Sequence, residues 1–134
     1  IFTTYWNINW GNPGTDRVHV STDNGITFDD MSTGLSELPV NVIVYQNGSD
    51  DVLYVGCDDG VYYWHQPTLC WIKMAGNFPS CIITDLSIDY CRGKLIAGTK
   101  GRGVWECDLV QFPSQNANPN NKKIASNSLK IPLS

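Results

Sequence analysis

A hydrophobic pattern that repeats every 43 residues is the feature that most constrains how this chain can fold. The segment "VNVIVYQNGSDDVLYVGCDDGVYYW" (residues 40–64) aligns with "ITDLSIDYCRGKLIAGTKGRGVWEC" (residues 83–107). Equivalent apolar residues are 43 positions apart, with a slip of one where Leu53 meets Leu95: Val40 and Ile83, Ile43 and Leu86, Val61 and Val104. A repeat of this length indicates copies of one supersecondary unit.

The segment before residue 40 follows the same spacing, because "RVHVSTDNGITF" (17–28) aligns with "GVYYWHQPTLCW" (60–71). Two pairs of apolar residues are equivalent here: Val18 with Val61, and Phe28 with Trp71. Short runs of Val, Ile and aromatic residues separated by Gly-containing turns are typical of β-strands. The expected strands are 1–8, 16–21, 26–30, 40–46, 52–57, 60–65, 70–74, 82–89, 94–99 and 102–109.

Four short strands in each 40 to 45 residues match the period of a β-propeller blade. An immunoglobulin-like sandwich also has closely spaced strands, but it does not repeat its hydrophobic pattern at 43 residues. We therefore expect an all-β fold of about two and a half four-stranded antiparallel blades in residues 1–111. A propeller needs at least four blades to close. The chain is then an incomplete propeller whose partners are further blades from the same protein, another chain or a second copy.

Composition and charge separate residues 1–111 from residues 112–134. The first part has six basic and 13 acidic residues, for a net charge of −7, and the second has three Lys and no acid. The second part is rich in Asn, Ser and Pro, which predicts a linker or flexible tail. An acidic body argues against nucleic-acid binding, and no apolar run approaches the roughly 20 residues of a membrane-spanning helix.

The beginning of the chain and its cysteines add two further expectations. The sequence begins at Ile1, without Met or a signal peptide, so we expect a piece or processed product of a longer protein. The cysteines lack the CxxC spacing of a zinc site, and we expect neither a metal nor a cofactor. Cys81 and Cys91 flank one expected strand and lie too far apart to pair, and other pairings stay open: the five are Cys57, Cys70, Cys81, Cys91 and Cys107.

The stretch "STDNGITF" is expected to join the third and fourth strands of the first blade. Asp23 can accept backbone N–H groups, Gly25 can adopt the positive φ of the turn, and Phe28 can bury its ring beneath it. The pattern Ser-x-Asp-x-Gly-x-Thr-Phe resembles the Asp-box, or bacterial neuraminidase repeat, at all five positions: Ser21, Asp23, Gly25, Thr27 and Phe28. We assign these residues a structural role.

The resemblance implies a propeller like those of sialidases, xyloglucanases and the sortilin luminal domain. In the next hairpin, "WHQPTLCW", Gln66 replaces the Asp and only Trp71 remains. Residues 34–109 resemble the last blades of large secreted bacterial Asp-box propellers, in which "GRGVWE.DL" ends the propeller. The resemblance implies a secreted or cell-surface protein, with type IX secretion as the possible export route.

In such propellers the boxes lie on the face opposite the ligand site. The loops expected on the ligand face are 7–16, 31–39, 57–60, 75–81 and 99–103. The candidate ligand-face residues in or beside these loops are Trp6, Trp10, Asp58, Asp59, Lys100 and Arg102.

Each candidate also has a structural interpretation. Trp10 suits stacking on a sugar, or both Trp6 and Trp10 fill the gap between blades. Adjacent strand residues point to opposite faces, so Asp58 and Asp59 cannot easily flank one glycosidic bond as glycosidase carboxylates do. Formation of the turn before Gly60 is their favoured role. Arg102 suits a substrate carboxylate, as a sialidase arginine does, but an ion pair with an acid of the neighbouring blade is the favoured role.

Three functions remain open on these observations. The first is a non-catalytic terminal segment of a propeller that acts as a scaffold or as a glycan- or protein-binding surface. The second is a structural portion of a glycoside hydrolase whose catalytic residues lie in missing blades. The third is a self-assembling surface protein. We assign no catalytic residue within this chain, and fold alone cannot choose among the three.

Overall fold

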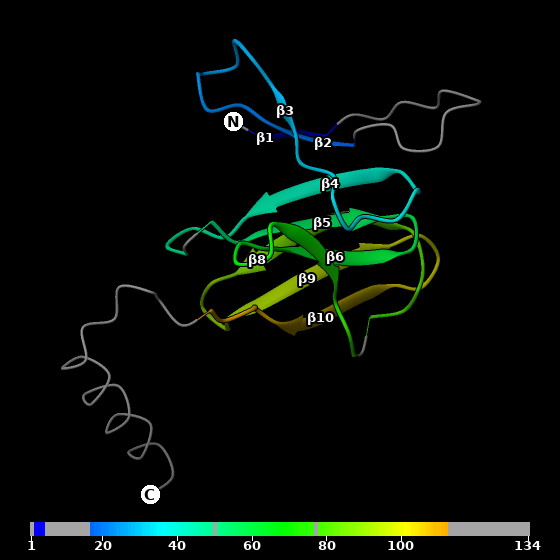
Figure 1. The fold of residues 1–134 in the computed structure, drawn as a ribbon. Coiled ribbons are helices and arrows are strands. Elements are labelled where there is room, and N and C mark those ends of the chain that lie inside the picture. The colour runs from blue at the N-terminus through cyan, green and yellow to red at the C-terminus, as the bar shows by residue number, and fades with distance from the viewer. Residues whose placement is uncertain (1, 5–16, 50, 77, 113–134) are drawn as a thin grey trace, which may run out of the picture.

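The computed structural model describes residues 2–4, 17–49, 51–76 and 78–112, which contain strands and turns but no helix. Figure 1 shows the strands in chain order. Their bounds are β1 Phe2–Thr4, β2 Val18–Val20, β3 Asp29–Asp30, β4 Val40–Tyr45, β5 Leu53–Cys57, β6 Gly60–His65, β7 Cys70–Lys73, β8 Ile83–Asp89, β9 Lys94–Thr99 and β10 Val104–Asp108.

The strands form three antiparallel sheets. The first sheet has the order β1-β2-β3, the middle sheet β4-β5-β6-β7, and the last sheet β10-β9-β8. Every expected strand is present, but β3 is shorter than the expected 26–30. The reason is local: the N–H groups of Ile26 and Thr27 bond to the Asp23 side chain, so they are not available to a strand partner.

The 43-residue repeat is a repeat of backbone geometry as well as of sequence. A register irregularity between Val40 and Val42 in β4 recurs between Ile83 and Asp85 in β8. The bond from the Met31 N–H to the Val18 carbonyl (2.8 Å) likewise recurs from Met74 to Val61 (2.9 Å). The same arrangement of strands therefore occurs more than once along the chain.

The sheets are stacked, with the middle sheet between the other two (Figure 1). Alternate residues of β5 point to opposite faces, so Leu53 and Val55 pack toward the first sheet and Tyr54 toward the last. The first core cluster is Val18, Val40, Leu53, Val55, Cys57, Tyr62, Trp64 and Trp71. The second is Val52, Tyr54, Val61, Ile83, Leu86, Leu95, Ala97 and Leu109. A strand buried on both faces explains the continuous apolar run of β5.

Gly56 allows the middle and last sheets to approach closely. A Cβ at this position would lie 2.5 Å from Ile83 Cγ2 and 2.8 Å from Val42 Cγ1. Both distances are shorter than carbon atoms tolerate. The equivalent Gly98 of the last sheet has ordinary space, with Asp85 Cβ as its nearest neighbour at 3.5 Å.

Phe28 contradicts its predicted burial, because 46% of it is exposed. Its equivalent Trp71 is 2% exposed. The difference arises because residues 31–33 cover Trp71: its indole N–H donates to the Met31 carbonyl (2.6 Å) and its backbone N–H to the Thr33 carbonyl (2.8 Å). No described segment covers Phe28 in this way.

The first described residue of the expected tail packs against the body. The Phe112 ring lies 6.0 Å from the Tyr63 ring and 5.3 Å from the His65 ring. Phe112, the first residue of the expected tail, thus packs on the middle sheet. The rest of the expected tail, residues 113–134, lies outside the described residues.

Candidate functional site

Four of the five loops expected on the ligand face meet at one end of the stacked sheets. The Asp58 N–H bonds to the Pro39 carbonyl (3.2 Å), and the Lys100 N–H bonds to the Ile82 carbonyl (2.9 Å). Asn41 joins the middle sheet to the last sheet. Its side-chain amide donates to Asp58 Oδ1 in the β5–β6 turn (2.8 Å) and to the carbonyl of Ile83 on β8 (3.0 Å). The fifth loop, 7–16, lies outside the described residues together with Trp6 and Trp10.

Asp59 is the most heavily bonded side chain at this end. Its Oδ2 accepts the Tyr62 hydroxyl (2.8 Å) and the Lys73 ammonium (3.1 Å), and its Oδ1 accepts the Ser36 hydroxyl (3.1 Å). Partial burial acts to raise the pKa of Asp59, but the bonds from Tyr62, Lys73 and Ser36 outweigh it and the pKa lies below its usual value. The carboxylate is therefore ionised and fully engaged.

Asp58 and Asp59 have separate partners, as expected for adjacent residues at the end of a strand. Asp58 accepts the Asn41 amide, whereas Asp59 turns toward the Tyr62 and Lys73 side. The two carboxylates thus do not converge on one open site. Their local roles are to hold the β5–β6 turn and to join it to its neighbours.

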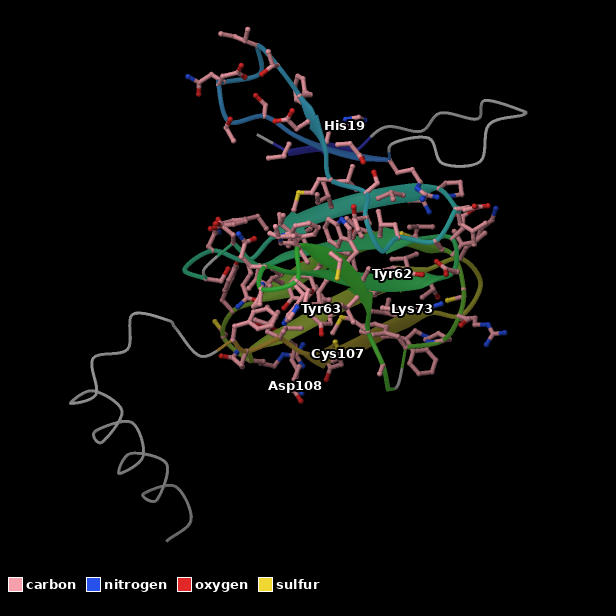
Figure 2. All side chains as sticks on the ribbon, in the orientation of Figure 1. His19, Tyr62, Tyr63, Lys73, Cys107 and Asp108 are labelled. Atoms are coloured by element: carbon pink, nitrogen blue, oxygen red, sulfur yellow. The ribbon has the colours of Figure 1, made fainter. Side chains whose placement is uncertain are left out.

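Sequence reasoning missed Lys73 and Ser36 as members of this cluster. Tyr62 and Lys73 are cross-strand partners on β6 and β7, and their side chains lie side by side (Figure 2). The Lys73 Nζ stands 5.7 Å from the centre of the Tyr62 ring, which adds a cation–π contact. The pairing register of the β6–β7 hairpin was the available signal for Lys73.

Lys100 and Arg102 lie on the β9–β10 turn at the same end. Arg102 is fixed through its backbone: its N–H donates to Thr99 Oγ1 (3.2 Å), and its carbonyl accepts the Trp105 indole N–H (2.8 Å). The expected ion pair of Arg102 with an acid of the neighbouring sheet is not formed among the described residues. Arg102 and Lys100 are exposed, so they leave positive charge at this end.

The Cys57 thiol at this end is buried. Burial, followed by the nearby Asp59 charge, raises the pKa of Cys57 to about 12, so the thiol stays protonated. All five thiols are free in the structure, including the two that flank β8. Among the described residues no group of His, Cys, Asp or Glu is arranged to hold a metal ion.

The Asp23 turn lies at the opposite end. Asp23 Oδ1 accepts the N–H groups of Ile26 (3.1 Å) and Thr27 (2.9 Å) and the Ser21 hydroxyl (2.8 Å), while Oδ2 accepts the Thr27 hydroxyl (2.5 Å). Gly25 has a φ of 88°. The bonds from Thr27 and Ser21 lower the pKa of Asp23 to about 2. Both Asp23 oxygens are thus used to hold the turn.

Comparison with protein-family models, curated proteins and solved structures finds no match to this chain. No helix among the described residues is long and apolar enough to cross a membrane.

Proposed function

We propose that the chain forms the terminal blades of a secreted or cell-surface Asp-box β-propeller and acts there as a non-catalytic scaffold and glycan-binding surface. The observation that carries this proposal is the backbone unit repeated at 43 residues, with its irregularity at Val40–Val42 and again at Ile83–Asp85. The bonding of Asp23 supports the assignment of its hairpin to the Asp-box.

The binding surface in this proposal is the end that carries the β5–β6 and β9–β10 turns. Asp58 and Asp59 are both engaged by protein partners, which favours a structural role for them over acid–base chemistry. Arg102 and Lys100 remain exposed there. Cations in this position suit a carboxylated glycan such as a sialylated or uronic-acid sugar.

Titration calorimetry of the whole chain tests the glycan site directly. We expect sialyllactose to bind more tightly than neutral lactose, and we expect Arg102→Ala to reduce the affinity about tenfold, as loss of a charge-assisted contact does. Asp29→Asn is the control, because Asp29 is exposed on β3 and belongs to none of the loops at this end. Equal weak binding of both sugars, or no effect of Arg102→Ala, would contradict the proposed site.

A self-assembling surface protein is a second candidate, supported by the open edge of the last sheet. In the middle sheet β6 pairs with β7, but the equivalent β10 pairs only with β9 among the described strands. Val104 on β10 is 73% exposed. Exposed strand edges pair readily with other chains. Light scattering tests self-assembly by measuring the molar mass over a range of protein concentrations. A mass of 14.9 kDa, that of the monomer, at all concentrations would rule self-assembly out.

A further inference from the structure

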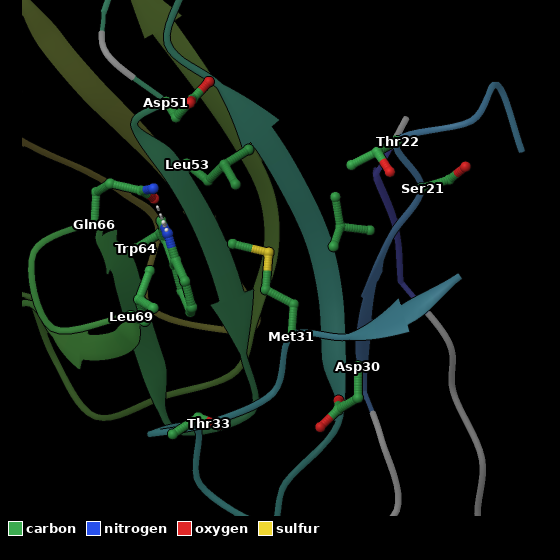
Figure 3. Close-up of a pocket in the computed structure, with 11 residues that line it drawn as sticks. Ser21, Thr22, Asp30, Met31, Thr33, Asp51, Leu53, Trp64, Gln66 and Leu69 are labelled. Atoms are coloured by element: carbon green, nitrogen blue, oxygen red, sulfur yellow. Dashed lines mark hydrogen bonds between the residues drawn. The ribbon is translucent and has the colours of Figure 1, made fainter. Parts of the chain in front are cut away.

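A groove lies between the first and middle sheets, at the same end as the Asp23 turn (Figure 3). Its volume is about 560 Å³, and its walls include the apolar side chains of Met31, Leu53 and Trp64. Asp30 and Asp51 line it as well, and no basic residue does. The groove thus combines apolar side chains with two carboxylates and uncharged polar residues.

The backbone is strained beside this groove. Leu69 has a φ of 49° and is 59% exposed, and Asp51 has a φ of 57°. Both residues line the groove. A bulky residue with positive φ is uncommon and costs free energy, and such residues concentrate where function requires them. An exposed Leu held in this conformation gives the groove an additional apolar contact.

The equivalent place between the middle and last sheets shows what fills such a groove. There Phe112 packs on Tyr63 and His65. These two residues are 43 positions after Val20 and Thr22, which line the groove between the first and middle sheets. Between the middle and last sheets, the segment that follows β10 thus supplies an aromatic ring, that of Phe112. Between the first and middle sheets, no described segment supplies such a ring.

We propose that this groove binds residues 122–131 of the same chain, "KKIASNSLKI". Lys122, Lys123 and Lys130 complement the charges of Asp30 and Asp51, and Ile124, Leu129 and Ile131 suit the apolar side chains of the groove. The segment can reach the groove, because Phe112 packs on His65 and the next residue, Gln66, lines it. Nine residues separate Phe112 from Lys122, and the ten Cα–Cα steps between them span up to about 35 Å. The inference does not depend on the propeller assignment.

Trypsin digestion of the whole chain tests the inference, because trypsin cleaves after Lys122, Lys123 and Lys130. We expect Asp30→Asn combined with Asp51→Asn to raise the cleavage rate at these three sites about threefold to tenfold, since two charge pairs are lost. High salt should raise the cleavage rate of the unaltered chain by a similar factor, because salt screens the same charge pairs. Thr22→Trp, which obstructs the groove without changing its charge, should have the same effect, and Glu37→Gln should have none.

Equal cleavage rates in the unaltered chain and both groove variants would overturn the proposal. Protection that increases with protein concentration would also overturn it, because the bound segment would then come from a second copy. Thermal unfolding of each variant separates loss of docking from loss of the fold. Protection that is independent of concentration and lost in both groove variants would support it.

Discussion

The last sheet repeats the backbone pattern of the first three strands of the middle sheet, yet the corresponding faces of the two sheets have different chemistry. The face of the middle sheet that packs on the last sheet is apolar. The same face of the last sheet points away from the stack and is largely polar. The equivalent pairs are Val42 and Asp85, Val44 and Ser87, Val52 and Lys94, Tyr54 and Ile96, Val61 and Val104, and Tyr63 and Glu106.

Ion pairs cover this outward face. Arg92 binds Asp89 (2.7 Å) and Glu106 (3.0 Å), and Lys94 binds Asp108 (2.8 Å). Hydrogen bonds from Arg92 lower the pKa of Asp89, and the bond to Asp108 raises the pKa of Lys94. Terminal units of stacked repeats commonly have a polar outer face. Repeated backbone geometry therefore does not require repeated burial, and any further sheet packed on this face would meet charged side chains.

The largest expected effect comes from the two equivalent glycines. Gly56→Ala should lower the free energy of unfolding by about 3 kcal/mol, because its new methyl group would collide with Ile83 and Val42. Gly98→Ala should change it by less than about 0.5 kcal/mol, since the space there is ordinary. Urea denaturation measures both. Equal effects would show that the two sheets are not packed differently.

Val61 and Val104 provide the next test, because they are 1% and 73% exposed. Val61→Ala should cost about 2 kcal/mol through lost apolar burial and an unfilled cavity. Val104→Ala should cost less than about 0.5 kcal/mol. A comparable loss at Val104 in the same denaturation experiment would mean that something covers the outward face.

Tyr54 tests the polar contacts on the face of the middle sheet that packs on the last sheet. Its hydroxyl donates to Gln46 Oε1 (2.8 Å) and accepts the Val110 N–H (2.8 Å). Tyr54→Phe should cost about 1 kcal/mol, because these groups lose their partner while the ring remains. Tyr45→Phe is the control, since that hydroxyl makes one long bond of 3.4 Å to the Ser49 carbonyl on an exposed turn. A larger effect at Tyr45 would contradict the assignment.

Asp23 distinguishes the first hairpin from the next one, where Gln66 stands in its place. The pKa of Asp23 is about 2 in the fold, below its usual 3.8, so its stabilising contribution is present above pH 4. That contribution is lost as the pH falls from about 4 toward 2. Asp23→Asn should therefore lower the melting temperature at pH 6 more than at pH 2.5, with Asp29→Asn as the control. An equal shift at both pH values would disprove this origin.

Glu106 should show the smallest effect. Glu106→Gln removes one exposed ion pair to Arg92, and exposed pairs contribute little because water and salt screen them. We expect no change in melting temperature at physiological salt and only a slight one at low salt. A clear loss at physiological salt would mean that the outward face is shielded from water.

Much of the fold could be predicted from the sequence, because strands, turns and repeats are local patterns. The strand positions and the Asp23 turn chemistry were predictable for this reason. The cluster around Asp59 was only partly predictable. The role of Asp59 in its turn was predicted from the local sequence, but Ser36 comes from a distant loop and Lys73 from another strand. The burial of Phe28 was predicted wrongly, because a local pattern does not specify which segment covers a ring.

The sequence by itself determined the repeating unit, because the alternation of apolar residues and the positions of Asp and Gly turns specify strands and hairpins without reference to distant residues. Only the tertiary structure decided which equivalent residues are buried. Val61 and Val104 have the same side chain and the same place in the repeat, yet one is enclosed and the other faces solvent. Burial depends on which sheet lies opposite, and that is a property of the whole stack.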